Sequence, residues 1–403
     1  MIGPESRFFV VLLGALMTVN VLSIDMILPA LPQLGASLNA TPDQVQLTLS
    51  LYLVGYAVGQ IGCGPLSDRF GRRPVLLGGL SIYTLASLAC ALSRAIEPLV
   101  VARFIQGLAG CGGPVIVRAI VRDHWSGARA AHTLSLLTTV FAAGPLIAPI
   151  LGGAILVRAG WPAIFLAIAL VALMFLAAAW FALAESHPSP DRDALKPARI
   201  AANYGTFFAS RAAFGFAVVN GLCWVGIFSF ISSSPFVLID YYGVRPDHYG
   251  YYFGLSAVTL VLGAATNRRL LRYLPSDRVL RIGFGVLVAG GAVSLAVAMW
   301  AAAGPLALMG GVMIYMFGQT LVQPNAVAAA LDPLRHMAGT GSSLLGVIQM
   351  LCGAAGGYAV NAVYDGTPRP MGAMILLAAL ASSGLYAALL GRARSAAASS
   401  ERR

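Results

Sequence analysis

The stretch GPLSDRFGRRP, from Gly64 to Pro74, places one aspartate and three arginines between two long apolar runs. Those runs, near residues 45–66 and 74–93, are each long enough to cross roughly 30 Å of hydrocarbon as helices. A charged segment between two spans lies at a membrane surface, and three arginines in a short connection favour the cytoplasmic side. This stretch therefore predicts both a membrane-spanning fold and its orientation.

Composition agrees with a membrane protein. With 58% hydrophobic and 10% charged residues, a chain of 403 residues has too little polar surface to cover a soluble globule. The net charge of +11 would be typical of a nucleic-acid-binding protein, but here the basic residues fall in short connections between apolar runs. We therefore expect a lipid bilayer around the chain and no nucleic-acid partner. The apolar run after Arg7 lacks a small-residue cleavage site and is predicted to be an uncleaved first span.

About twelve apolar runs separated by glycine, proline and charge predict an all-α protein with about twelve transmembrane helices. When connections are assigned to alternate sides, 20 of the 26 basic residues fall on one side and four on the other. This bias predicts that both termini are cytoplasmic. The runs lie near residues 8–29, 45–66, 74–93, 98–121, 132–156, 161–183, 207–235, 248–270, 278–301, 304–328, 339–363 and 371–391.

The longest polar connection, Glu185 to Tyr204, divides the chain into two halves of six spans. The spacing of Gly64, Asp68 and Arg69 recurs 199 residues later, as expected for pseudo-symmetric six-helix bundles. Transporters built from repeated halves bind substrate near the midplane between them. The predicted parts are an N-terminal bundle (1–184), a cytoplasmic linker (185–205), a C-terminal bundle (206–392) and a cytoplasmic tail (393–403).

Enzymatic and metal chemistry find no support in the sequence. All five cysteines lie in apolar runs, where they are expected to be packing residues, and the five histidines form no cluster at ligand spacing. There is no phosphate-binding loop and no constellation of nucleophile and base. We expect no metal, no cofactor other than protons as coupling ion, and no enzymatic activity.

Two charged residues interrupt predicted spans at similar depth. Asp25 lies about 18 residues, or ~27 Å of helix, beyond Arg7, and Arg103 lies roughly a turn and a half inside the fourth run from its outer end. A charge in the hydrocarbon costs on the order of 2.5–3.5 kcal/mol, so we expect the two to pair. Such a pair either locks two helices together or acts as a proton switch in which Asp25 is protonated when Arg103 moves away.

Neutral polar residues are the candidates for a substrate cavity. Some recur at helical spacing on one face of a span, and the others are single positions. They either hold helices together or line a cavity for a drug-sized molecule. Arg118 either lines the inner vestibule or extends to the membrane surface. The candidates are Asn20, Tyr52, Tyr56, Arg118, Asn220, Trp224, Tyr315, Gln319, Gln323 and Gln349.

The fifth run carries glycine, alanine and proline at regular spacing. Proline removes a helix hydrogen bond and glycine lets backbones approach, so this span is predicted to be kinked and closely packed. Ordinary small-residue packing is the alternative. The series comprises Gly144, Pro145, Ala148, Pro149, Gly152 and Gly153.

The opening stretch resembles the loop signature of the major facilitator superfamily, Gly-x-Leu-x-Asp-Arg-x-Gly-Arg-Arg, and matches it without a gap. Arg103-Phe-Ile-Gln106-Gly107 is similar to the family's proton-coupling signature, and the fifth-run series resembles its antiporter signature with Ala148 in place of glycine. The segments Asp25 to Pro32 and Arg118 to Asp123 resemble the bicyclomycin and chloramphenicol exporter subfamily.

The resemblance implies a bacterial inner-membrane antiporter that works as a monomer and expels a lipophilic drug in exchange for protons by alternating access. Some multidrug relatives carry a second acid where this chain has Met17, so we expect neutral or weakly charged substrates such as phenicols or bicyclomycin-like compounds. In this interpretation Asp25 and Arg103 couple protons. The charged loop is expected to be a cytoplasmic gate formed by Gly64, Asp68, Arg69, Gly71, Arg72 and Arg73.

Asp68 adds a hypothesis of its own, because the positive-inside rule does not require a carboxylate in this loop. We expect it to contact the amino end of the helix that begins near Gly339, where a helix dipole favours negative charge by about 0.3–1 kcal/mol.

Two other functions remain open. The same fold could serve a proton-coupled exporter or importer of a sugar or metabolite, since fold does not fix substrate. A membrane receptor without transport would need a soluble output domain, which the sequence does not offer.

Overall fold

The computed structural model describes residues 6–187, 191, 193–300 and 302–400, and within these ranges the chain folds into helices without a β-strand. Part of the predicted linker (188–190 and 192) and the end of the predicted tail (401–403) lie outside the described residues. The predicted all-α fold is confirmed.

Ten helical stretches of the described chain are long and apolar enough to cross a membrane. One of them, His132–Ala182, contains two predicted spans, and its backbone leaves the helical conformation at Gly160, where φ is +76°. Helix α10 (Pro246–Leu270) has 25 residues and falls outside the ten because tyrosine and glycine dilute its apolar residues. With these two assignments, each of the twelve predicted runs corresponds to a helix.

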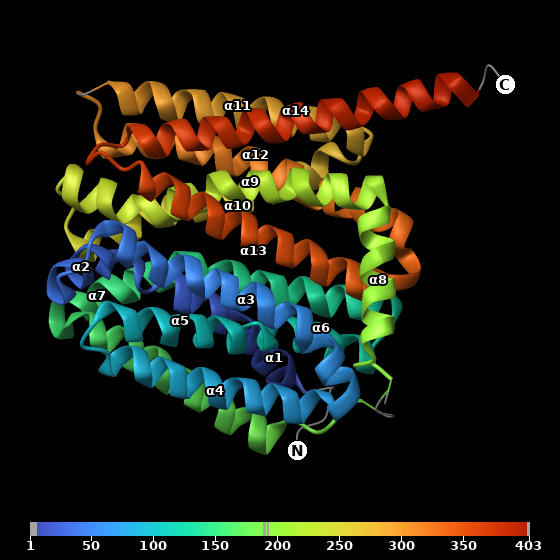
Figure 1. Cartoon of the computed structure of the whole chain (residues 1–403), viewed down its shortest axis with the longest axis horizontal. Coiled ribbons are helices and arrows are strands. Elements are labelled where there is room, and N and C mark those ends of the chain that lie inside the picture. The colour runs from blue at the N-terminus through green and yellow to red at the C-terminus, as the bar shows by residue number, and fades with distance from the viewer. Residues whose placement is uncertain (1–5, 188–190, 192, 301, 401–403) are drawn as a thin grey trace. The chain divides into compact units, whose positions relative to one another are not determined.

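The helices form two compact units, shown in Figure 1. The first comprises residues 1–201 with 234–257, and the second comprises 202–233 with 258–403. The predicted division at 185–205 stays a prediction. The first unit contains α1 (Arg7–Asp25), η1 (Leu28–Ala30), α2 (Leu31–Leu38), α3 (Pro42–Phe70), α4 (Arg72–Leu92), α5 (Ile96–Gly110), α6 (Gly112–His124), α7 (Gly127–Ala182), η2 (Phe236–Tyr241) and part of α10.

Local sequence explains where key helices of the first unit begin and end. Thr41 and Gln44 form a reciprocal capping box at the start of α3. Gly71, with φ of +97°, separates α3 from α4 in a conformation that L side chains rarely adopt. The fourth predicted run is divided at Cys111 into α5 and α6, just before Pro114, which has no backbone N–H to donate.

Helices α3 and α5 approach backbone to backbone. A Cβ added to Gly107 would lie 2.0 Å from the carbonyl oxygen of Tyr52, and one added to Gly55 would lie 2.1 Å from that of Phe104. Only glycine allows this approach, which brings the side chains around Tyr52 and Arg103 together.

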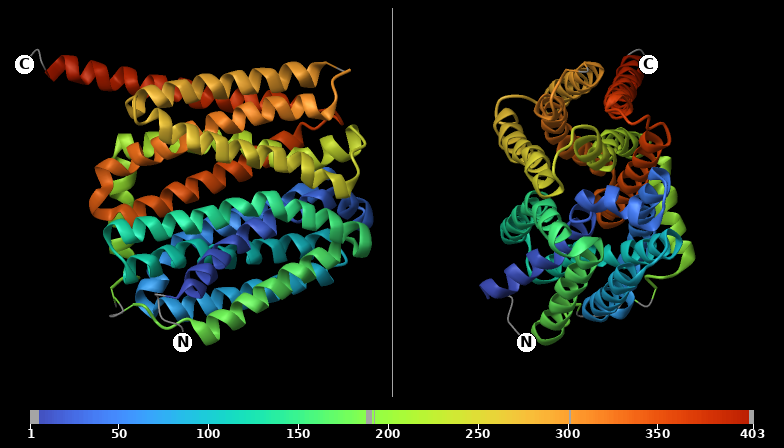
Figure 2. Two further views of the ribbon diagram at one scale, coloured as in Figure 1. Left: turned by 180° about the vertical axis from the view of Figure 1, so that it is seen from behind. Right: turned by 90° about the vertical axis from the view of Figure 1, so that its left-hand side faces the viewer.

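The second unit contains most of α9 (Arg211–Pro235), part of α8 (Pro197–Ala209), the rest of α10, α11 (Ser276–Met299), α12 (Pro305–Leu331), η3 (Asp332–Met337), α13 (Ala338–Ala362) and α14 (Arg369–Ser400). Helices α11 and α14 lie side by side in both views of Figure 2. One core cluster is formed by Phe207, Ala213, Ala217, Ala330, Leu334, Leu344 and Leu345.

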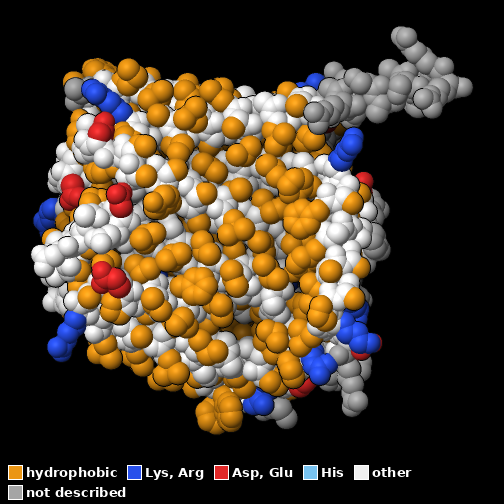
Figure 3. Space-filling model, in the orientation of Figure 1, with side chains coloured by type: hydrophobic (Ala, Val, Ile, Leu, Met, Phe, Trp, Pro, Cys, Tyr) orange, Lys and Arg blue, Asp and Glu red, His pale blue; other side chains and the backbone are white. Residues whose placement is uncertain are grey.

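Large apolar side chains also cover the outer faces of the helices. Figure 3 shows hydrophobic side chains over the middle of the helices and charged ones near their ends. Leu85 and Leu170, for example, are 66% and 67% exposed. Surface of this kind is stable in contact with lipid, and the protein is a multi-pass membrane protein.

Candidate functional site

Asp25 is the last residue of α1 and is buried in the first unit. Its electrostatic neighbour is Tyr249 of α10, whose hydroxyl is hydrogen-bonded to the Ser234 hydroxyl over 2.7 Å. Both Tyr249 and Ser234 are buried. Sequence reasoning missed these two residues, because nothing in a linear pattern places the beginning of α10 beside the end of α1.

The expected pair between Asp25 and Arg103 is wrong. Within the described residues no hydrogen bond or ion pair joins them, and Arg103 is turned toward α3 instead. Counting residues along a helix estimates depth but does not determine the direction in which the arginine points around its helix.

Arg103 is completely buried without a carboxylate partner in the described chain. Its Nε donates to the carbonyl oxygen of Thr48 at 3.1 Å, and its Nη1 donates to Gln106 Oε1 at 2.5 Å. The guanidinium carbon lies 4.2 Å from the centre of the Tyr52 ring and 5.7 Å from that of Phe165. Carbonyl and amide dipoles together with aromatic faces therefore stabilise this cation.

A cation–π contact with Tyr52 and a hydrogen bond to Gln106 link Arg103 to α1 and α4. Tyr52 donates to Asn20 Oδ1 at 2.7 Å, so the structure brings Asn20, Tyr52 and Arg103 together. Gln106 Nε2 donates to Ser87 Oγ at 2.7 Å. A second hydrogen bond joins α4 to α1, because the Tyr83 hydroxyl donates to the carbonyl oxygen of Val19 at 3.1 Å.

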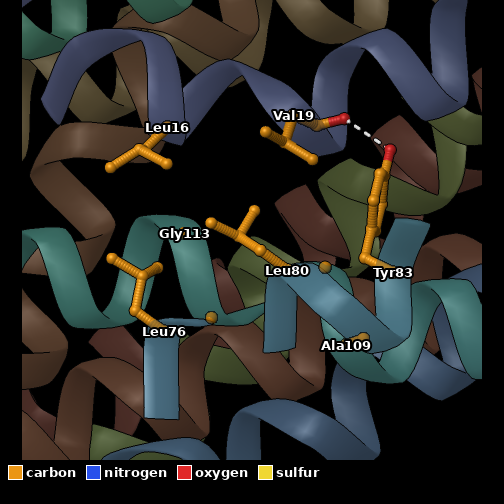
Figure 4. A pocket seen from close by; sticks show the side chains of 9 residues that line it. Leu16, Val19, Leu76, Leu80, Tyr83, Ala109 and Gly113 are labelled. Carbon is orange, nitrogen blue, oxygen red and sulfur yellow. Dashed lines mark hydrogen bonds between the residues drawn. The ribbon is translucent and has the colours of Figure 1, made fainter. Parts of the chain in front are cut away.

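A small apolar pocket lies beside the Tyr83 bond (Figure 4). The close-up shows Leu16 and Val19 of α1 on one side and Leu76 and Leu80 of α4 on the other. The pocket presents no charged side chain and belongs to the packing of the first unit.

Tyr56 follows Tyr52 by one turn of α3, and Arg118 lies on α6. Tyr56 is buried and is an electrostatic neighbour of Arg118. The Arg118 side chain is exposed, and its Nε donates to the carbonyl oxygen of Pro114 at 2.8 Å in its own helix. This position is compatible with both roles considered for Arg118.

The remaining cavity candidates belong to the second unit. Asn220, Tyr315 and Gln319 are buried, whereas Trp224, Gln323 and Gln349 are half-buried. The Tyr315 hydroxyl donates to the carbonyl oxygen of Cys223 at 2.8 Å and so joins α12 to α9.

The charged loop is organised around Arg72. Its guanidinium forms an ion pair with Asp68, donates through Nε to Asp123 Oδ2 at 3.0 Å and through Nη1 to Ser67 Oγ at 2.7 Å. Asp68 is thus engaged with a residue of its own loop. The predicted contact of Asp68 near Gly339 stays a prediction.

Glu185 completes the loop from the far end of α7. Its two carboxylate oxygens accept the backbone N–H groups of Arg72 and Arg73 at 2.9 and 3.1 Å and thereby cap α4. Arg73 also donates to the carbonyl oxygen of Trp180 at 2.7 Å. A Cβ at Gly71 would lie 2.5 Å from Glu185 Oε2, which explains the glycine at this position. Sequence reasoning missed the role of Glu185, although it is the first acid after the sixth apolar run.

The small residues of α7 pack closely against neighbouring segments, which both interpretations of the series allow. A Cβ at Gly144 would lie 2.7 Å from Val21 Cγ1, and one at Gly152 would lie 2.0 Å from the Met26 carbonyl oxygen. A Cβ at Gly153 would lie 2.5 Å from the Pro246 carbonyl oxygen, and Ala148 is completely buried. The helix continues through Pro145 and Pro149.

Long apolar helices that bury polar and charged side chains inside their bundles define a polytopic membrane protein. The comparison with known families makes this specific. The model of the Major Facilitator Superfamily matches residues 13–357, and the chain belongs to that family of transporters.

Relatives match most of the chain. A bicyclomycin resistance protein homolog of Haemophilus influenzae is 31% identical over 382 residues, which cover 93% of this chain and 94% of the relative. The multidrug resistance protein MdtL of Escherichia coli is 31% identical over 357 residues, 86% of either chain. A solved structure of a bacterial homologue of the human lysosomal transporter Spinster superposes with a TM-score of 0.74 at 15% identity, covering 95% of this chain and 96% of the other. This last likeness concerns the fold alone.

Proposed function

We propose that this chain is a proton-coupled antiporter of the bacterial inner membrane that exports lipophilic drugs which are neutral or weakly charged. The observation that carries the proposal is Asp25, a buried acid with no basic partner among the described residues. A carboxyl group without a fixed counter-ion can bind and release a proton when it is alternately exposed to water on the two sides of the membrane. The resistance functions named for the relatives support a drug as the second substrate.

In this mechanism a proton from outside binds Asp25 and favours release of drug outward. Loss of the proton toward the cytoplasm then prepares the protein for the next molecule. A proton crossing 100 mV contributes about 2.3 kcal/mol, which suffices for roughly fifty-fold accumulation of drug per proton. Arg103 belongs to the proton pathway only indirectly, through Tyr52 and Asn20, because it does not touch Asp25.

We further propose that two six-helix bundles alternate around the substrate, that both termini are cytoplasmic and that the monomer is the transporting unit. The bias of basic residues toward one set of connections supports the orientation. Reporter fusions at the two ends would test it, and a translocated amino terminus would contradict it.

The proton role is tested with Asp25→Asn in proteoliposomes. Wild-type protein is expected to exchange chloramphenicol for protons when a pH gradient is imposed, and Asp25→Asn is expected to lose this exchange while melting at an unchanged temperature in detergent. Asp43→Asn is the matched control, because Asp43 is an exposed acid in the first turn of α3. Full exchange by Asp25→Asn would contradict the proposal.

The direction and the substrate class need separate measurements. Uptake of chloramphenicol into inside-out vesicles on energisation is expected for an exporter, whereas an importer would show none. In a growth-inhibition panel, neutral phenicols and bicyclomycin are expected to be better substrates than lipophilic dications. The opposite ranking would overturn the inference from Met17.

A further inference from the structure

Helices α9 and α12 of the second unit bury polar atoms that have no hydrogen-bond partner in the described part of the chain. Asn220 is 0% and Gln319 is 1% exposed, and within the described residues both the amide oxygen and the amide nitrogen of each lack a hydrogen bond. The indole N–H of Trp224 is also buried and unpaired there. A buried polar group without a partner costs about 1–3 kcal/mol of folding free energy, so five such atoms destabilise the fold considerably unless a ligand pairs with them.

The three side chains share one level of the unit. Asn220 and Trp224 are four residues apart and lie on the same face of α9. Cys223 lies between these two residues in the sequence, and the hydrogen bond from Tyr315 to its carbonyl oxygen holds α12 against this part of α9. Successive membrane spans alternate in direction, and α12 is the third span after α9, so the two helices run antiparallel. The turn of α12 that follows Tyr315 therefore lies toward the beginning of α9. Gln319 is therefore placed level with Asn220.

Another side-chain amide of α12, that of Asn325, has hydrogen-bond partners for both its oxygen and its nitrogen. Asn325 Nδ2 donates to Asn267 Oδ1 at 2.9 Å and to the Leu321 carbonyl oxygen at 2.8 Å, and its Oδ1 accepts from Ser276 Oγ at 2.9 Å. In this unit, a side-chain amide that joins helices therefore makes hydrogen bonds with both of its ends. Asn220 and Gln319 are the side-chain amides of the described chain whose two ends are both buried and unpaired. Residues that join helices would bond to one another, and these do not.

We propose that Asn220, Gln319 and Trp224 form a neutral hydrogen-bonding subsite that binds the amide and hydroxyl groups of the exported molecule. This inference rests on the function proposed above and specifies its ligand. Each amide offers a donor and an acceptor, and Trp224 adds one donor together with an aromatic face that lies 5.7 Å from the Phe228 ring. None of the three carries a charge. The ligand class is a compact neutral molecule with amide or hydroxyl groups on an apolar or aromatic body, which includes chloramphenicol and bicyclomycin.

The test combines stability with binding. Gln319→Met and Asn220→Leu keep the side-chain volume and remove the unpaired atoms, so both variants are expected to melt at or above the wild-type temperature in detergent. Equilibrium binding of radiolabelled chloramphenicol is expected to weaken at least tenfold in each. Asn325→Leu is the control on the same helix: it breaks a paired network and is expected to lower the melting temperature while the folded protein binds chloramphenicol as the wild type does.

Two results would overturn the subsite. One is a melting temperature lowered by Gln319→Met or Asn220→Leu as by Asn325→Leu, since that identifies a structural role. The other is unchanged binding in both variants. Failure of wild-type protein to bind either chloramphenicol or bicyclomycin would overturn the ligand class. Because binding is measured without a proton gradient, a wild type that binds but exchanges no protons would contradict the proposed function and leave the subsite standing.

Discussion

The guanidinium of Arg103 lies 4.2 Å from the centre of the Tyr52 ring. This contact replaces the ion pair that a buried arginine usually needs, and it depends on the planar shape of the guanidinium. Arg103 simultaneously donates to Thr48 and Gln106 in directions that a single ammonium group cannot reproduce.

Arg103→Lys is therefore expected to destabilise the protein although it keeps the charge. The loss is about 1–3 kcal/mol, because buried acceptors are left unpaired, and it appears as a lower melting temperature in detergent. Arg94→Lys, at an exposed position between α4 and α5, is the control and is expected to melt like the wild type. Equal melting of the two variants would show that charge alone matters at Arg103.

Gly64 and Gly71 both belong to the family's loop signature but differ in their surroundings. A Cβ at Gly64 would meet no atom beyond its chain neighbours, but Pro65 follows directly and disfavours the helical conformation of a preceding residue that carries a Cβ. This offsets the higher helix propensity of alanine, so Gly64→Ala is expected to melt close to the wild-type temperature. Gly71→Ala is expected to destabilise, because φ is +97° and the Cβ would meet Glu185. Thermal melting of the two variants tests this, and a loss for Gly64→Ala as large as that for Gly71→Ala would contradict it.

Glu185→Ala is expected to weaken the connection between the end of α7 and the start of α4. Two backbone N–H groups lose their acceptor, at a cost of about 1 kcal/mol for a cap at the protein surface. Glu185→Gln retains one acceptor oxygen and should lose less. Hydrogen exchange at the first turn of α4 measures the effect, and equal protection in all three proteins would argue against capping.

Asp191 gives an expectation for pH. The pKa of Asp191 lies below its ordinary value of 3.8 because its carboxylate accepts the backbone N–H of Asp193 and a hydrogen bond from Arg199. A lowered folded pKa means that this turn is stabilised above the ordinary pKa and loses that contribution as the pH falls through the folded value. An NMR titration of the full-length protein should give a midpoint below 3.8, and Arg199→Gln should raise it. A midpoint unaffected by Arg199→Gln would assign the shift to the backbone alone.

The sequence was sufficient for the helices because an apolar run of about twenty residues has few stable alternatives in a membrane. It also placed the boundary within α7 correctly, between residues 156 and 161, where Gly160 interrupts the helix. The pairing of Asp25 with Arg103 failed because helical rise determines depth but not which neighbour a side chain meets. Here the close approach of Gly107 to Tyr52 turns Arg103 toward α3.

Other parts of the site were beyond reach for different reasons. Asn220 and Gln319 could be selected by residue type, but only the folded structure shows that their amides have no partner among the described residues. The contact between Glu185 and Arg72 joins residues more than a hundred positions apart and leaves no periodic trace.

The neighbouring glycines of α7 have a mechanical consequence. Gly152 bears directly on the backbone of Met26, the residue after Asp25, and Gly153 bears on the backbone of Pro246 at the start of α10. Because neither glycine has a side chain that could change its rotamer, the end of α1, this part of α7 and the start of α10 are in direct backbone contact. If Asp25 gains and loses a proton as proposed, a shift at the end of α1 would be passed to the start of α10 through these backbone contacts.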